Sequence, residues 1–214
     1  MIATVAAAIV LLALQAGAPR LAPVSDESRD GAFHAYIGKL KAAVAKRDEK
    51  ALRKLVDPSV ITMDEAGKDQ RGWEKFRAAW GVGENDGAAW EVLADLMELG
   101  FFREAPGIYV SPYVVWKFPR DLDPNLHLVV LRDALPLREK PERDSRPVAT
   151  LAFDIVKKVG EAREEGAFEW VEVQTASGAR GFVQAANVRS PLMPRAQFSR
   201  KDGRWVLTVL DRAR

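Results

Sequence analysis

The amino-acid sequence predicts an α+β protein in which a helix-rich N-terminal region is followed by a small β-barrel and a C-terminal β-hairpin. Two observations support this prediction. Between Phe33 and Met97, apolar residues recur three and four positions apart, which is the spacing of one helix face. Beyond Gly100 the chain changes to short runs of β-branched and aromatic residues separated by Gly and Pro, which is typical of strands and turns.

The N-terminus carries an uncharged apolar run at residues 2–14, followed by small residues at 16–18. The run is shorter than the roughly 20 residues that span a bilayer, and it matches the apolar region of a secretory signal peptide. We therefore expect residues 1–22 to be a signal peptide and the protein to be exported to the periplasm or beyond the cell. An uncleaved anchor is the alternative, and any membrane contact would then involve this segment alone.

Residues 23–124 are expected to form a helix-rich α+β domain. A first helix should bury one face, and Asp48 is a suitable N-cap for a second short helix that Asp57–Pro58 would end. Helical spacing returns around Trp73–Trp80 and Trp90–Met97. Gly100 suits the left-handed position that follows a helix. The predicted buried face of the first helix consists of Phe33, Tyr36, Ile37, Leu40, Ala43 and Val44.

The segment 108–118 is rich in aromatic and β-branched residues and is expected to be extended. Short strand-like pieces then follow between Gly- and Pro-marked turns, and they predict a small closed barrel over residues 125–192. Asp202–Gly203 is a strong hairpin turn signal within residues 193–214. We expect this hairpin to pack against the barrel or to return to the strands at 108–118.

The barrel segment resembles the bacterial SH3 (SH3b) domain family. The resemblance covers about 60 of the 214 residues, and it depends on the order of four short motifs: Pro136-Leu137-Arg138, Pro147–Leu151, Trp170–Val173 and Gly178–Val183. Pro136 stands where the family usually has Asn, and Phe182 where it usually has Trp. The resemblance implies an SH3-like barrel that attaches to cell-wall peptide or serves as an accessory module in the envelope.

Five residues are the candidate ligand-binding residues. Trp170, together with Phe182 and Arg138 of the other barrel motifs, could form an aromatic groove of the kind with which SH3-type barrels bind peptides. Tyr113 and Trp116 could line a cleft between the two parts of the protein, where ligands often bind. Ordinary packing is the alternative in both places.

The sequence contains no recognisable catalytic motif. It has no G-x-S-x-G elbow, no P-loop, no G-x-G-x-x-G and no Cys, and neither His34 nor His127 lies in a metal-binding spacing. We therefore predict no catalytic residue, no metal and no cofactor. The 32 basic residues nearly balance the 30 acidic ones, which argues against a nucleic-acid partner.

These observations favour an exported, non-catalytic binding or scaffolding protein of the cell envelope. Its partner would be a cell-wall component such as peptidoglycan, or an extended peptide of an envelope protein, held by the SH3b-like domain. The alternative is a small enzyme with its site between the N-terminal helices and the strands at 108–118. An enzyme would need a deep pocket with a buried carboxylate or His of shifted pKa, whereas a binder would need a groove rimmed by aromatic residues.

Overall fold

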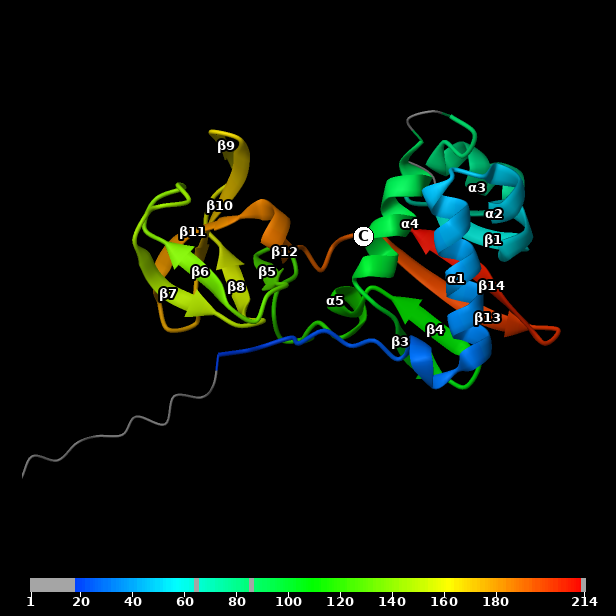
Figure 1. Cartoon of the computed structure of the whole chain (residues 1–214), viewed down its shortest axis with the longest axis horizontal. Helices are drawn as coiled ribbons and strands as arrows, with labels where there is room; N and C mark the ends of the chain where they lie inside the picture. The colour runs from blue at the N-terminus through cyan, green and yellow to red at the C-terminus, as the bar shows by residue number, and fades with distance from the viewer. Residues whose placement is uncertain (1–17, 64–65, 85–86, 213–214) are drawn as a thin grey trace, which may run out of the picture.

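The computed structural model describes residues 18–63, 66–84 and 87–212. The predicted signal peptide therefore lies outside the described residues up to position 17. The chain forms two lobes that lie side by side (Figure 1). The first lobe comprises residues 26–118 and 195–212, and the second comprises residues 119–194. Each lobe is built on its own β-sheet.

Helices of the first lobe begin where the sequence offers caps. The Asp30 carboxylate accepts a hydrogen bond from the Phe33 backbone N–H at 2.9 Å, and that of Asp48 accepts one from Ala51 at 3.0 Å. The N-cap predicted at Asp48 is thus confirmed. The helices are α1 (Gly31–Ala45), α2 (Glu49–Leu55), α3 (Trp73–Trp80) and α4 (Ala88–Glu98), preceded by the 3₁₀ turn η1 (Glu27–Arg29).

A six-stranded sheet completes the first lobe, in the order β2-β1-β14-β13-β4-β3. β14 runs parallel to β1, and the other neighbours pair antiparallel. The strands are β1 (Val56–Met63), β2 (Asp69–Arg71), β3 (Phe102–Ala105), β4 (Ile108–Ser111), β13 (Arg195–Lys201) and β14 (Arg204–Asp211). Two of the six therefore come from the C-terminal end of the chain.

The core of the first lobe is centred on Phe33 of α1. Its ring stacks on that of Tyr109 with 3.9 Å between centroids, and it also contacts the rings of Phe101, Phe198 and Trp205. The three tryptophans at 73, 80 and 90 are buried in the same core, as their helical spacing predicts. Helices and sheet thus share one apolar layer.

The second lobe is an eight-stranded sheet in the order β12-β5-β8-β10-β11-β6-β7, with β9 paired to β10. Its strands are β5 (His127–Val130), β6 (Leu135–Arg138), β7 (Pro147–Leu151), β8 (Ile155–Lys158), β9 (Arg163–Glu165), β10 (Phe168–Gln174), β11 (Arg180–Gln184) and β12 (Val188–Arg189). The 3₁₀ turn η2 (Ala185–Asn187) precedes the last strand.

The predicted fold class is wrong in two respects. The closed SH3-like barrel expected at 125–192 is absent, because the end strands β7 and β12 pair only with β6 and β5, which leaves the sheet open. The protein is also mostly β, with about 37% of the described residues in strands and 27% in helices. The N-terminal region is less helical than predicted, since it contributes four strands to the first sheet.

A further correction concerns residues 113–118, which were expected to be extended. Pro112 precedes a short helix, α5 (Tyr113–Trp116), in which Tyr113 and Val114 are buried. Tertiary packing has overridden the β-propensity of this run. α5 leads directly into the second lobe.

The hairpin predicted around Asp202–Gly203 is present, and both turn residues have positive φ, 48° and 76°. Of the two places that the sequence left open for it, the structure has it beside β4, where Ala196 pairs with Ser111. β4 and β13 are therefore neighbours in space. The whole second lobe is an insertion between these two strands.

The lobes are joined by residues 19–26, which we call the strap. The Leu21 N–H donates to Phe153 O and the Ile155 N–H donates to Pro19 O, both at 2.8 Å, in the second lobe. At its other end, the Asp26 N–H donates to Phe101 O of the first lobe. Figure 1 shows the strap running from one lobe to the other.

An apolar cluster supports the same junction. It combines Tyr113 and Val114 of α5 with Val129 and Ile155 of the second sheet, and Leu21 of the strap packs against it. The two lobes thus meet over a continuous apolar contact that is covered by the strap.

The described residues contain no helix long and apolar enough to cross a membrane.

Candidate functional site

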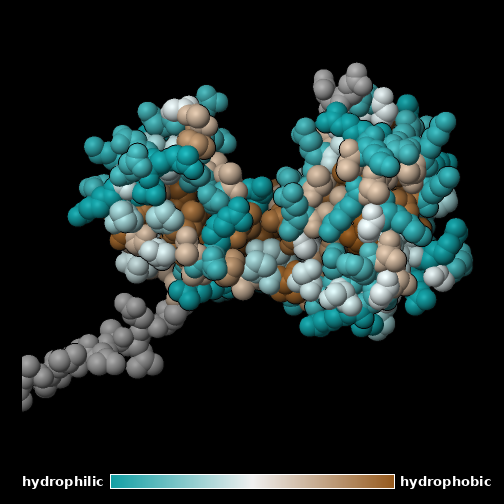
Figure 2. Space-filling view, in the orientation of Figure 1, coloured by the Kyte–Doolittle hydropathy of each residue, from teal (hydrophilic) through white to brown (hydrophobic). Residues whose placement is uncertain are grey.

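A cavity of about 360 Å³ lies between the two lobes; we call it the interlobe cleft. Figure 2 shows the surface hollowed between the lobes, with hydrophobic residues at the bottom of the hollow. Residues of α4, α5, the strap and the second lobe line the cleft. The site is therefore assembled from segments that are far apart in the sequence.

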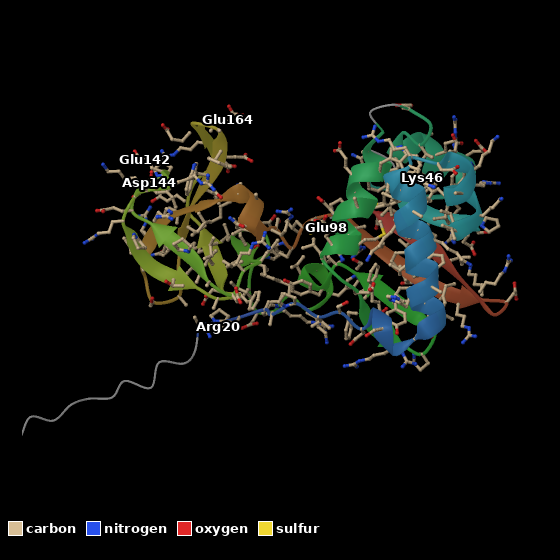
Figure 3. All side chains as sticks on the ribbon, in the orientation of Figure 1. Arg20, Lys46, Glu98, Glu142, Asp144 and Glu164 are labelled. Carbon is tan, nitrogen blue, oxygen red and sulfur yellow. The ribbon has the colours of Figure 1, made fainter. Side chains whose placement is uncertain are left out.

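The first-lobe wall of the cleft is acidic. Asp95 and Glu98 are exposed in the last turn of α4, and Figure 3 shows Glu98 at the side of the helix that borders the hollow. The C-terminus of a helix carries the negative end of its dipole and disfavours carboxylates by about 0.3–1 kcal/mol each. No basic residue compensates in this last turn. These carboxylates are therefore not explained by the stability of α4.

The second-lobe wall is basic, because its charged residues are Arg132 and Arg189, which lie beside Leu131 and Ala186. Arg132 Nε donates to the side-chain oxygen of Asn187 at 3.1 Å. Arg189 Nη1 donates to the carbonyl oxygens of Ala186 and Val188 at 3.2 and 3.0 Å. Each bond holds one nitrogen of a guanidinium that has five N–H donors. Both arginines are thus oriented and keep donors for another acceptor.

Within the described part of the chain, no ion pair joins the acidic wall to the basic wall. Neither Asp95 nor Glu98 forms an ion pair there, and neither do Arg132 and Arg189. Opposite charges face each other across the cleft without meeting. The cleft therefore presents a negative side and a positive side to a molecule that enters it.

Tyr113 also lines the cleft, as the sequence suggested. Its side chain is 2% exposed, and its hydroxyl has no hydrogen-bond partner among the described residues. A buried polar group without a partner costs about 1–3 kcal/mol. Burial raises the pKa of Tyr113, so the hydroxyl stays protonated at neutral pH and remains a donor. A ligand in the cleft is one source of the missing acceptor.

Trp116, the second residue expected in the cleft, is elsewhere. Its indole lies on α5 with the Arg195 guanidinium 5.8 Å from the ring centroid, and its buried Nε1 has no hydrogen-bond partner within the described ranges. It is absent from the lining of the cleft. Only one of the two predicted cleft residues therefore belongs to the site.

The other three predicted residues lie together in the second sheet. Phe182 pairs with Arg138 across β11 and β6, and the Arg163 guanidinium lies 4.6 Å from the Phe182 ring centroid. Trp170 is only 3% exposed, in the strand that pairs with β9. Arg138 Nη1 donates to Ser145 O at 2.6 Å. Trp170 is thus mostly packed within the sheet, but it also lines a cavity of about 270 Å³ with Phe168 and Arg143. Its indole Nε1 has no hydrogen-bond partner among the described residues.

Sequence reasoning missed all four charged residues that line the cleft. Two acidic residues three positions apart at a helix end, Asp95 and Glu98, are a signal that could have been noticed. Arg132 and Arg189 could not have been paired from the sequence, because β5 and β12 meet only through the topology of the second sheet. The two walls come together only in the folded protein.

The enzyme alternative placed its site between the N-terminal helices and the strands at 108–118, where the structure has the packed core of the first lobe. The buried carboxylates of the described residues are each paired with a cation, and none of them lines the interlobe cleft: Asp26 with Arg29, Asp57 with Lys201, Asp154 with Arg20 and Asp211 with Arg195.

Both histidines are held by local partners. His34 Nδ1 lies 3.5 Å from a Glu27 carboxylate oxygen, and His127 Nδ1 lies 2.8 Å from Asp123 O. Two hydrogen bonds from Asn125 lower the pKa of Asp123, which is outside the cleft. In the described ranges no three His, Asp or Glu side chains are grouped so that they could hold a metal ion.

No family model matches this chain, and no curated protein matches it.

Proposed function

We propose that this chain is a non-catalytic binding protein whose interlobe cleft holds a small ligand carrying both charges, such as a short peptide with free ends. The observation that carries the proposal is the pair of opposed, unpaired charged walls beside the buried Tyr113 hydroxyl. A zwitterion satisfies both walls at once, whereas an anion or a cation would satisfy only one.

The ligand would lie across the cleft in one orientation. Its ammonium group faces Asp95 and Glu98, and its carboxylate accepts from Arg132 and Arg189, whose planar guanidinium groups suit a carboxylate. The Tyr113 hydroxyl donates to a peptide carbonyl. A volume of about 360 Å³ is at the small end of the range of about 300–1,000 Å³ for ligand pockets, which favours a peptide of a few residues.

The proposal keeps the peptide ligand that the sequence suggested but assigns it to the cleft, because the barrel that was to hold it is absent. Export remains part of the proposal, on the basis of the apolar run at residues 2–14. Stem peptides of peptidoglycan carry both ammonium and carboxylate groups. In the cell envelope, stem peptides are therefore the ligands that we propose for the cleft.

The test is retention of a pooled tripeptide library by immobilised protein comprising residues 19–214. Three forms of the library are compared: free ends, acetylated N-termini and amidated C-termini. Retention should require both free ends, because each cap removes the charge that one wall recognises. Equal retention of the capped and free libraries, or no retention at all, would contradict the proposal.

Variants locate the binding. Glu98→Gln and Arg132→Gln should each lower retention of the free library about tenfold, since each removes a charged partner of the ligand. Glu91→Gln, in the first turn of α4, and Arg146→Gln, on the second lobe, change the same charges outside the cleft. These two controls should retain the library like the unmodified protein.

A further inference from the structure

A second cavity, of about 550 Å³, opens on the first lobe between α1, α2 and the start of β14; we call it the helix–hairpin pocket. Figure 1 shows these three elements next to one another, on the side of the first lobe away from the second. Its lining residues belong to the first lobe alone. It is therefore a site separate from the interlobe cleft.

Small residues make this pocket hollow. Ala32 and Ala35 of α1, Ala51 of α2 and Gly203 of the hairpin turn line it. On α1 the lining residues follow the three-and-four spacing of a second helix face, beside the face that packs in the core. The short side chains leave space that larger residues would fill.

The body of the pocket is apolar and held in place. Tyr36, Leu55 and Trp205 line it, and the Tyr36 hydroxyl donates to Leu55 O at 2.9 Å. This bond ties α1 to the end of α2. Burial raises the pKa of Tyr36, so the bond persists at neutral and mildly alkaline pH. The pocket is thus formed before a ligand arrives.

The charged residues of the pocket are all cationic. Lys39, Lys54 and Arg204 line it and are exposed, and no Asp or Glu is part of the lining. In the described part of the chain none of the three forms an ion pair, whereas nearby Lys201 is paired with Asp57 at 2.8 Å. Three unpaired cations beside an apolar hollow favour an anion that has an apolar body.

We propose that the helix–hairpin pocket binds one single-chain amphiphile with an anionic head, of the fatty-acid type. The alkyl chain lies over Tyr36, Leu55 and Trp205, and the head group lies among Lys39, Lys54 and Arg204. The ligand is a free molecule and not a bilayer surface, since the binding surface is a concave pocket between two helices and a turn.

The test uses dodecanoate below its micelle concentration, titrated calorimetrically into protein comprising residues 19–214. Dodecanoate should bind one to one. Dodecyltrimethylammonium has the same chain with a cationic head and should bind at least tenfold more weakly. Equal binding of the two amphiphiles, or no binding of dodecanoate, would overturn the proposal.

Two matched pairs of variants on α1 place the ligand. Lys39→Glu should weaken dodecanoate binding about tenfold, and Lys41→Glu, which is exposed on the same helix outside the pocket, should not. Ala35→Trp should abolish binding by filling the pocket, and Ala42→Trp should leave it intact. Equal effects within either pair would assign the binding to another surface.

Vesicles distinguish a free ligand from a membrane. The protein should not float with phosphatidylglycerol vesicles that contain no fatty acid. Flotation that Lys39→Glu abolishes, without one-to-one binding of dodecanoate, would show that Lys39, Lys54 and Arg204 bind a membrane surface. That result would overturn the proposal. Neither result depends on the interlobe cleft, because Tyr113 and Arg132 are unchanged in all these variants.

Discussion

The guanidinium Nε of Arg20 lies 3.5 Å from a carboxylate oxygen of Asp154, and backbone hydrogen bonds on both sides make the pair a short antiparallel bridge. Arg20 is largely exposed, but Asp154 is buried and also accepts from the Ala152 N–H. The strap is therefore attached to the second lobe mainly by its backbone and by Leu21. Residues 19–22, which fall within the predicted signal peptide, belong to the described fold.

Loss of residues 19–22, the part of the strap that bonds to the second lobe, should destabilise the protein. A chain that begins at Pro23 should have a free energy of unfolding about 2 kcal/mol lower than one that begins at Pro19. It lacks the apolar contact of Leu21 and two backbone hydrogen bonds. Urea unfolding of both proteins measures the difference. Arg20→Ala should cost well under 1 kcal/mol, since its ion pair is mostly exposed; equal stability of the two chain lengths would refute the role of the strap.

Gly100 should not tolerate a side chain. Its φ is +81°, and a Cβ there would lie 2.8 Å from Val24 O of the strap. Gly100→Ala should therefore lower the free energy of unfolding by about 2 kcal/mol. Gly38→Ala is the matched control, because this position lies within α1 with no atom within 4 Å of the new Cβ. It should raise stability by about 0.5–1 kcal/mol, so a loss at both positions would contradict the argument.

The buried hydrogen bond from Trp80 Nε1 to Thr62 Oγ1, 2.8 Å long, ties α3 to β1. Thr62→Val keeps the shape of the side chain but leaves the indole N–H without an acceptor, which should cost about 1–3 kcal/mol. Thr62→Ser keeps the hydroxyl and should cost less. Thermal unfolding ranks the two variants, and the reverse order would show that the methyl group matters more than the hydrogen bond.

Tyr113→Phe should leave stability at pH 7 unchanged or raise it slightly, because the hydroxyl it removes has no hydrogen-bond partner in the part of the chain that the structure describes. The same variant should lose retention of the tripeptide library if the hydroxyl contacts the ligand. Urea unfolding and the retention assay together separate the two effects. A loss of stability above about 1 kcal/mol would indicate an internal partner for the hydroxyl.

Alkaline pH should destabilise the protein through its buried tyrosines. Burial raises the pKa of Tyr36, Tyr109 and Tyr113, so above about pH 10 the unfolded chain loses protons that the folded chain keeps. Stability is therefore independent of these groups at lower pH and falls as the pH rises beyond 10. Tyr113→Phe should show a shallower fall between pH 9 and 11 in urea titrations, and an identical slope would contradict this assignment.

Local patterns in the sequence predicted local structure well. The buried face of α1, the N-cap at Asp48, the left-handed Gly100 and the turn at Asp202–Gly203 all depend on residues within one or two turns of each other. Such patterns do not determine which strands become neighbours. The strand-like pieces of the second lobe therefore suggested a closed barrel, although the pairing between them leaves the sheet open.

The start of β1 and the helical form of α5 were hidden for specific reasons. β1 begins at Val56, directly where α2 ends, so Asp57–Pro58 marks the change from helix to strand and not a loop. α5 was hidden by the β-propensity of its own residues. In the candidate site Tyr113 could be proposed from its aromatic surroundings, whereas the charged walls depend on the meeting of the two lobes.

The insertion of the second lobe between β4 and β13 fixes the order in which the protein can be completed. β13 and β14 occupy the middle of the first sheet but leave the ribosome after its other four strands. Until they arrive, β1 lacks its parallel neighbour, and Phe33 lacks the rings of Phe198 and Trp205. The inserted second lobe is complete earlier in synthesis, so it can fold before β13 and β14 have completed the first lobe.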